Sequence, residues 1–252
     1  MRLFIVLSAL LFAQAASAQS NEKLYGSNTD VRTVLAFKVD DAKVQKLVPA
    51  GWVVDSPSAG PNKGANLGIT LIDQIVQLDA EGKPLPPIKG AVFTFPGKKA
   101  DSDAAGTVVW GGLVSAASAP GVYGVYVPAK GAIDRKSRTD VAGESIVDEV
   151  WQFTSDDGTG VEIQIQYVRG VPTRNKAEAK VYSAAKPDFY RIYRLENLLD
   201  LARSTATGID RVKTFSIKAS GSKFGPLFDG SHQLISVTSQ PWYARHTYLP
   251  GS

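Results

Sequence analysis

Alternation of apolar and polar residues is the strongest pattern in the chain and predicts β-strands. It is clearest over 161–167, where every second residue is apolar and would lie on one face of a half-buried strand. Segment 147–153 and the turn-rich residues 155–158 come just before it, so the two segments are expected to form a hairpin. Other β-branched and aromatic segments bounded by turn residues predict strands at 33–39, 67–75, 91–95, 107–114 and 122–127.

Helical patterns are sparse. Segment 40–47 starts with a capping acid, has acids in its first turn and bases in its last, and stops before Pro49, as a short helix should. Segment 190–203 has apolar residues three and four positions apart, which favours a helix, although its aromatic start is equally typical of a strand. Many strands and few helices predict a mainly β (β-rich α+β) protein, arranged as a single-domain antiparallel barrel or sandwich. A barrel would remove exposed strand edges.

The first 18 residues resemble a signal peptide. A positively charged start is followed by an apolar stretch at 3–13, too short to cross a bilayer, and by the small residues 16–18. Cleavage after Ala18 would leave a domain at 19–252 and predicts a periplasmic or secreted protein with no membrane span after cleavage. A retained N-terminal anchor is the alternative, against which the small residues at the cleavage position argue.

Composition narrows the chemistry. The chain has 252 residues, 44% of them hydrophobic, and no cysteine, which excludes disulfides and thiolate nucleophiles. The formal charge is +4 with basic and acidic residues interspersed, so nucleic acid is not an expected partner. Neither His232 nor His246 has a second ligand at metal-binding spacing, and no glycine motif forms a phosphate loop. No metal and no cofactor is therefore predicted.

Short motifs along the chain resemble the acetoacetate decarboxylase-like family. Segment 34–51 is similar to the family's opening strand, short helix and Leu-x-Pro boundary, and 79–83 is similar to one of its loops. Residues 225–228, 234–237 and 248–250 are similar to its closing strands. Together these motifs cover nearly the whole chain after the leader. The resemblance implies a closed or cone-shaped β-barrel around an apolar cavity, and it makes a homo-oligomer plausible.

The resemblance also implies a Schiff-base lysine that acts on a β-keto acid. Such an amine must be uncharged to attack a carbonyl, which requires an apolar pocket or a neighbouring cation. The family has Pro-Lys-Lys at this place, whereas this chain has Pro128-Ala129-Lys130, so Lys130 is the candidate catalytic amine. Adjacent residues on a strand face opposite sides, so Lys130 would need a bulge near Pro128 to point inward. A second lysine pair at 98–99 is expected to be solvated in a loop.

Four residues are predicted to bind the substrate. Arg32 lies one residue from the place of a family arginine, and Tyr126 begins the motif that contains Lys130. Asp73 is the carboxylate inside an apolar strand and could face inward, or it could simply mark the strand end. Arg169 follows the alternating strand and could hold a carboxylate at a barrel mouth, or form a surface ion pair.

Three hypotheses follow from these residues. The first is an exported lyase that acts on a small oxo acid or ketone through a Schiff base, by decarboxylation or by aldol or dehydration chemistry. The second is a non-catalytic barrel that binds a small apolar or carboxylate ligand. The third is an interaction protein with a filled interior and no ligand. The direction and burial of Lys130, and the presence of a cavity, distinguish them.

Overall fold

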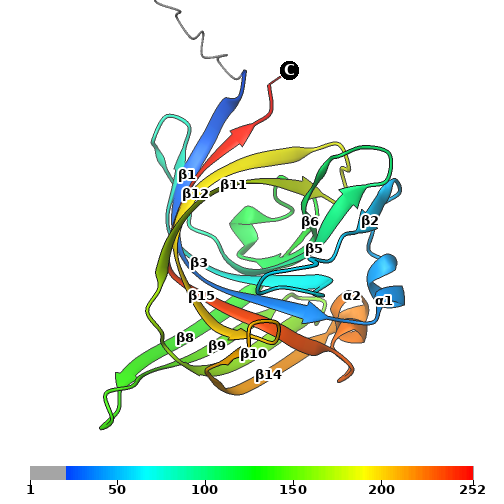
Figure 1. The fold of residues 1–252 in the computed structure, drawn as a ribbon. Coiled ribbons are helices and arrows are strands. Elements are labelled where there is room, and N and C mark those ends of the chain that lie inside the picture. The colour runs from blue at the N-terminus through cyan, green and yellow to red at the C-terminus, as the bar shows by residue number, and fades with distance from the viewer. Residues whose placement is uncertain (1–20, 252) are drawn as a thin grey trace, which may run out of the picture.

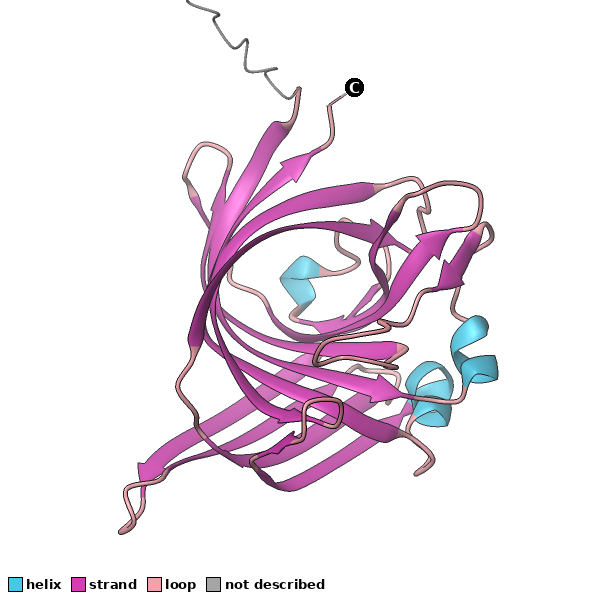
Figure 2. Cartoon of the chain, in the orientation of Figure 1, coloured by secondary structure: helices cyan, strands magenta, loops and turns pink. Residues whose placement is uncertain are grey.

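The protein is a closed β-barrel with a second sheet packed against its outside (Figure 1). The computed structural model describes residues 21–251, so the predicted signal peptide at 1–18 lies outside the described residues. Strands dominate and the helices are few and short (Figure 2). The mainly β fold predicted from the sequence is confirmed. No helix in the described part of the chain is long and apolar enough to cross a membrane.

The barrel wall is a ring of long strands in the order β5-β3-β1-β15-β12-β11-β6, which pairing between β6 and β5 closes. All neighbours in the ring are antiparallel except β6 and β11, which are parallel and joined by three residue pairs. The wall strands are β1 (Lys23–Lys38), β3 (Leu67–Asp79), β5 (Lys89–Lys99), β6 (Ala105–Val114), β11 (Thr173–Ser183), β12 (Tyr190–Ser204) and β15 (Gln233–Leu249).

Short strands extend this sheet at its margins: β2 (Trp52–Val54) pairs with β5, β4 (Pro84–Leu85) with β3, β7 (Tyr126–Pro128) with β6 and β13 (Ile209–Asp210) with β12. The second sheet has the order β14-β10-β9-β8 and is antiparallel throughout. Its strands are β8 (Lys130–Thr139), β9 (Ser145–Thr154), β10 (Gly160–Val168) and β14 (Val212–Ser220). The helices are α1 (Asp41–Gln45), α2 (Gly221–Phe224), η1 (Ala116–Ser118) and η2 (Gly225–Leu227).

The main hydrophobic core lies between the outer face of the barrel and the second sheet. Side chains at alternate positions of β1, β3 and β5, such as Leu35, Ile69 and Phe93, pack against Trp151 and Ile163 of the second sheet. This explains the alternation at 161–167, since the apolar face of β10 covers the barrel and its polar face meets solvent. The predicted hairpin at 147–167 is confirmed, because β9 pairs with β10 across the turn at 155–158.

Segment 190–203 is a strand, so the helical alternative is wrong. β12 pairs with β11 on one side and with β15 on the other, which commits its backbone to the barrel. Register shifts lie between Asn197 and Asp200 and between Leu201 and Arg203. β12 keeps a continuous register with β11 from Tyr190 to Leu199, so the helix-like spacing arises because both faces of the strand carry apolar residues: Leu195 lines the cavity, whereas Ile192 is buried on the opposite face.

The other predicted elements agree with the structure with two exceptions. The helix expected at 40–47 is α1, whose first turn is capped by the carboxylate of Asp40. Of the strand expected at 122–127, only the end forms, as β7, because Gly121 and Gly124 adopt positive φ angles in a tight turn. Lys98 and Lys99 lie at the end of β5 and not in a loop, and Lys99 forms an ion pair with the exposed Asp188.

Candidate functional site

The interior of the barrel contains a cavity of about 660 Å³. Much of its wall is aliphatic, contributed by alternate residues of β3, β5 and β6 together with the loop before β7. The short helix η1 supplies Ala117 and Ser118 to the lining, and its ribbon is seen inside the outline of the barrel in Figure 2. The interaction-protein hypothesis predicts a filled interior, which this cavity contradicts.

Three arginines and several tyrosines form the polar part of the wall. The arginines come from three neighbouring strands, β1, β15 and β12, and the tyrosines come from the same strands, from β7 and from the loop before it. The cavity lining defined by the described residues includes no lysine, aspartate or glutamate. Its charged side chains are therefore guanidinium groups: Arg32, Arg191 and Arg245.

Arg32 on β1 is held in place from behind. Its guanidinium donates two hydrogen bonds to Asp30, which is fully buried and also accepts a hydrogen bond from Asn28. On its other side, Arg32 lies 3.5 Å from the ring centroid of Tyr243. A buried carboxylate and an aromatic face thus fix the direction of this guanidinium.

Arg245 on β15 stacks against tyrosine rings on both flanks. Its guanidinium carbon is 3.9 Å from the ring centroid of Tyr193 and 6.0 Å from that of Tyr243. Its Nε donates a hydrogen bond of 2.9 Å to Oδ1 of Asn28. Arg245 therefore shares the Tyr243 ring with Arg32, so the two guanidiniums form one positively charged group at this level of the barrel.

Arg191 on β12 has the least satisfied guanidinium of the three. It lies 3.8 Å from the ring centroid of Tyr25 on β1 and is only 7% exposed. Its Nε and Nη2 atoms are buried and have no hydrogen-bond partner. A buried donor without a partner costs about 1–3 kcal/mol, and more when it is charged. A guanidinium that lines the cavity thus has two nitrogens without a hydrogen-bond partner in the described chain.

The arginines change the proton affinity of the tyrosines near them. Burial raises the pKa of Tyr193, but the guanidiniums of Arg245, Arg191 and Arg32 outweigh burial, and the net pKa is below the ordinary 10.0. Burial, together with Tyr193 itself, raises the pKa of its hydrogen-bonded neighbour Tyr123 well above that value. Tyr193 is therefore the phenol of this pair that ionises first, and its oxygen then accepts the hydrogen bond from Tyr123.

Positive charge exceeds negative charge in this wall. Arg32 has an ion pair with Asp30, whereas neither Arg191 nor Arg245 has one with any carboxylate within residues 21–251. Like charges gathered in a partly dry cavity repel each other more strongly than they would in water. The site thus has the electrostatics of an anion-binding cavity.

Two solved structures share this architecture over most of the chain. One is an acetoacetate decarboxylase-like enzyme from Sphingomonas wittichii RW1, with a TM-score of 0.51, 10% identity and coverage of 91% of this chain and 92% of that one. The chain has an acetoacetate decarboxylase-like fold. The other is the enduracididine biosynthesis enzyme MppR, solved with the condensation product of pyruvate and imidazole 4-carboxaldehyde, with a TM-score of 0.52, 10% identity and coverage of 89% and 87%. No family model and no curated protein sequence matches the chain.

Within this acetoacetate decarboxylase-like fold, Lys130 lies away from the cavity. It begins β8, the edge strand of the second sheet, and its side chain is 90% exposed. Its Nζ forms a 3.1 Å ion pair with the equally exposed Asp156. This is the opposite of the dry surroundings that a Schiff-base amine requires. No bulge turns it inward, because β8 pairs with β9 in continuous register from Lys130 onward.

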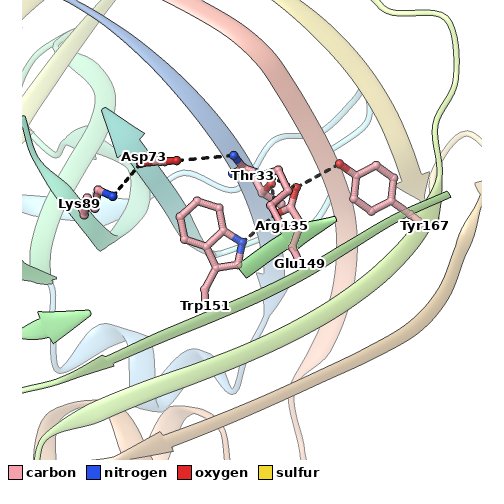
Figure 3. Close-up of polar contacts among 7 residues, drawn as sticks. All are labelled: Thr33, Asp73, Lys89, Arg135, Glu149, Trp151 and Tyr167. Carbon is pink, nitrogen blue, oxygen red and sulfur yellow. Dashed lines mark hydrogen bonds and ion pairs between the residues drawn. The ribbon is translucent and has the colours of Figure 1, made fainter. Parts of the chain in front are cut away.

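Asp73 points away from the cavity, so the expectation of an inward carboxylate is corrected. Its neighbours Ile72 and Gln74 line the cavity, and the alternation of β3 places Asp73 on the opposite face. There it forms ion pairs of 3.7 Å with Lys89 and with Arg135 of the second sheet (Figure 3).

A buried network next to this ion pair joins the two sheets. Glu149 on β9 is 2% exposed and accepts hydrogen bonds from Thr33 of the barrel (2.7 Å), Trp151 (2.8 Å), Tyr167 (3.2 Å) and Arg135 (3.2 Å), as Figure 3 shows. The four donors satisfy both carboxylate oxygens. The network lies outside the cavity, so its role is to fix the second sheet against the barrel.

Two other predicted residues lie in the cavity wall and one does not. Arg32 and Tyr126 both line it, so the structure brings them together. Arg169 is exposed in the loop after β10, where its backbone N–H bonds to the carbonyl of Ser145, and it does not line the cavity.

Sequence reasoning missed Arg191 and Arg245, together with the tyrosines that stack on them. A signal was present, since Arg191 and Tyr193 lie two residues apart, as do Tyr243 and Arg245. On a strand, residues two apart share a face. The helical alternative at 190–203 hid this pattern, because residues two apart on a helix point in different directions.

Proposed function

We propose that the protein binds a small organic acid in the barrel cavity, with its carboxylate on the arginines and its carbon skeleton against the aliphatic wall. The observation that carries this proposal is the pair of buried, unpartnered N–H groups on Arg191, in a cavity whose lining has guanidiniums and no acidic side chain. A guanidinium donates two parallel hydrogen bonds to a carboxylate, which fixes the direction of the acid as well as balancing its charge.

The size and lining of the cavity suit such a ligand. Ligand-binding cavities commonly have volumes of about 300–1,000 Å³, and this one has about 660 Å³. Valines and isoleucines of the same cavity, such as Val34, Ile72 and Val109, offer apolar surface to a short carbon chain. Binding would thus combine charge neutralisation at one side with burial of methylene groups at the other.

The Schiff-base lyase hypothesis has less support. It needs an amine in the cavity, and the lining has none; Lys130, the residue assigned to that step, is on the second sheet. We therefore favour the binding function over decarboxylation, aldol or dehydration chemistry through an iminium. The two differ in a measurable way, because only the lyase forms a covalent bond with an oxo acid.

Calorimetry with matched acids and amides tests the binding function. Butyrate and acetoacetate should bind to the purified protein, and butyramide, which has the same shape without the charge, should not. Arg191→Met should weaken butyrate about 10- to 100-fold, since charge-assisted hydrogen bonds are worth about 1.5–3 kcal/mol. Arg174→Met is the matched control, because Arg174 lies on the neighbouring strand β11, where its side chain is 68% exposed and pairs with Glu196. Absence of binding by any acid, or equal affinity in Arg191→Met, would contradict the proposal.

Borohydride trapping tests the lyase alternative directly. Protein incubated with acetoacetate or pyruvate is reduced with borohydride and its intact mass is measured. We expect no added mass. An adduct mapped to Lys130, or to any other lysine, would restore the Schiff-base hypothesis.

We also propose that the protein is exported and loses residues 1–18, placing the ligand in the periplasm or outside the cell. The apolar stretch at 3–13 and the small residues before position 19 support this. N-terminal sequencing of the protein recovered from its native compartment should begin at Gln19. A start at Met1 on membrane-bound protein would instead indicate a retained anchor. Light scattering of the same sample would test the homo-oligomer that the resemblance suggests.

A further inference from the structure

We infer that the ligand is a dicarboxylic acid, with one carboxylate bound by Arg32 and Arg245 and the other by Arg191. This inference rests on the proposed function and names the class of acid. It follows from two independent observations, the excess of positive charge in the wall and the placement of the arginines at different levels along the barrel.

The charge excess amounts to two units in the described part of the wall. Three guanidiniums line the cavity, and one buried carboxylate, that of Asp30, pairs with one of them. The remaining lining residues are neutral polar or apolar. A monocarboxylate would leave one guanidinium without a negative partner, whereas a dicarboxylate would balance both. Leaving a charge uncompensated in a desolvated site is costly, so this wall favours the doubly charged ligand.

Strand register places the three arginines at successive levels. Arg32 is opposite Gln240 on β15, and Arg245 is opposite Asn28, four residues farther along β1. Arg245 is also opposite Leu195 on β12, and Arg191 lies four residues beyond Leu195. At roughly 3.3 Å per residue, each step is about 13 Å along a strand, measured at the backbone.

Aromatic stacking divides the three side chains into two groups. Arg32 stacks on the ring of Tyr243 at 3.5 Å, and Arg245 approaches the same ring at 6.0 Å while it stacks on Tyr193 at 3.9 Å. Arg191 instead stacks on Tyr25, at 3.8 Å. Tyr25 is 41% exposed, whereas Tyr243 is 3% exposed. Arg32 and Arg245 can bind one carboxylate beside Tyr243, and Arg191 can bind a second beside Tyr25.

The wall between the two groups is suited to a carbon chain. Tyr193 lies between Arg191 and Leu195 on the inward face of β12, and Leu195 is opposite Arg245. A linear aliphatic dicarboxylate would run past these side chains with an anionic group at each end. Because the long arginine side chains can adjust their reach, the number of carbon atoms in the diacid that binds best is determined by titration.

The test compares acids of equal carbon number that differ in one charge. Succinate, glutarate and adipate are titrated by calorimetry against butyrate, valerate and hexanoate. The monomethyl ester of the best diacid is also titrated, because it retains the length and removes one charge. At least one diacid should bind about 10- to 100-fold more tightly than both its monoacid and its monoester. This comparison uses the unmodified protein and does not depend on the folding of any variant.

Arg191→Met then assigns the second carboxylate. In this variant the diacid should lose its advantage and bind no more tightly than the monoester, and both should bind more weakly than they do to the unmodified protein. Arg174→Met should retain the full advantage of the diacid. If Arg191→Met does not fold, as judged by circular dichroism, Arg191→Lys serves instead, because it retains the charge and loses the two-pronged geometry.

The outcomes separate this inference from the proposed function. If monoacids and diacids bind equally, the dicarboxylate inference is overturned while the proposal of an acid-binding cavity stands. If a diacid binds more tightly but Arg191→Met retains the advantage, the assignment to Arg191 is overturned. If no acid binds at all, both fail.

Discussion

Replacing Glu149 tests whether the buried network between the sheets stabilises the fold. Glu149→Ala removes the common acceptor of Thr33, Trp151, Tyr167 and Arg135. Of these donors, Tyr167 retains a 2.9 Å hydrogen bond with Ser239, and Arg135 retains its ion pair with Asp73. The hydroxyl of Thr33 and the indole N–H of Trp151 would lose the acceptor that the structure gives them in a region that water does not reach.

The expected cost is large for a single substitution. Breaking a buried ion pair by removing one partner costs about 3–5 kcal/mol, and each buried donor left unsatisfied costs about 1–3 kcal/mol. These contributions overlap, because they describe the same carboxylate, and Arg135 remains 23% exposed to water. We therefore expect the free energy of unfolding to fall by about 3–5 kcal/mol, which for a domain of this size lowers the melting temperature by roughly 6–20 °C.

Urea unfolding followed by tryptophan fluorescence measures this change, since Trp151 is itself in the network. Glu162→Ala is the matched control on the adjacent strand β10, where the carboxylate is partly exposed and its ion pair with Lys218 is at 3.8 Å. A change of less than about 0.5 kcal/mol is expected there. A loss of less than about 1 kcal/mol in Glu149→Ala would refute the argument that this carboxylate couples the two sheets.

Three further predictions concern other parts of the molecule. Lys130→Ala should alter neither acid binding nor stability by more than about 1 kcal/mol, since exposed ion pairs contribute little. Calorimetry measures the binding and urea unfolding measures the stability. A loss of binding would place this lysine in the site. Gly106→Ala should destabilise the protein and weaken acid binding, because a Cβ there would lie 2.4 Å from the carbonyl oxygen of Lys180, next to the short parallel pairing of β6 with β11. An unchanged melting temperature would show that this pairing tolerates the added methyl group. In an alkaline titration followed by phenolate absorbance, Tyr193→Phe should remove a tyrosine that ionises early, because the neighbouring guanidiniums hold the pKa of Tyr193 below 10.0. A bound dianion should move that ionisation to higher pH, and a titration unchanged by the substitution would contradict the electrostatic argument.

The sequence predicted the fold well where period-two alternation is uninterrupted. β10 and its hairpin with β9 follow from seven residues that alternate strictly, and α1 follows from its capping acid. At 190–203 the sequence left helix and strand open, because both faces of β12 carry apolar residues and the two-residue period is lost: Leu195 lines the cavity, whereas Ile192 is buried on the opposite face. Tertiary pairing overrode the local pattern.

The candidate site was less predictable, for a different physical reason. Arg32, Arg191 and Arg245 are far apart in the chain and meet only because β1, β15 and β12 are neighbours in the ring. No spacing rule within one segment reveals that adjacency. The motif around Lys130 could be recognised locally, but β8 begins at Lys130 and belongs to the second sheet, so the lysine leaves the barrel at that residue.

The described wall of the cavity contains guanidiniums and no amine, which limits the chemistry that its side chains can perform. A lysine can lose its proton in a dry site and become a nucleophile, whereas an arginine stays protonated at every pH that proteins tolerate. The charged side chains that line this cavity are arginines, so covalent attachment of a carbonyl to an amine of the wall has no group to perform it. What the wall can supply is fixed positive charge for an anion and, at Tyr193, a phenol that releases its proton more easily than usual. For the acid that we propose as ligand, this wall would supply charge stabilisation and a group for proton transfer, so identifying that acid comes before a search for a reaction.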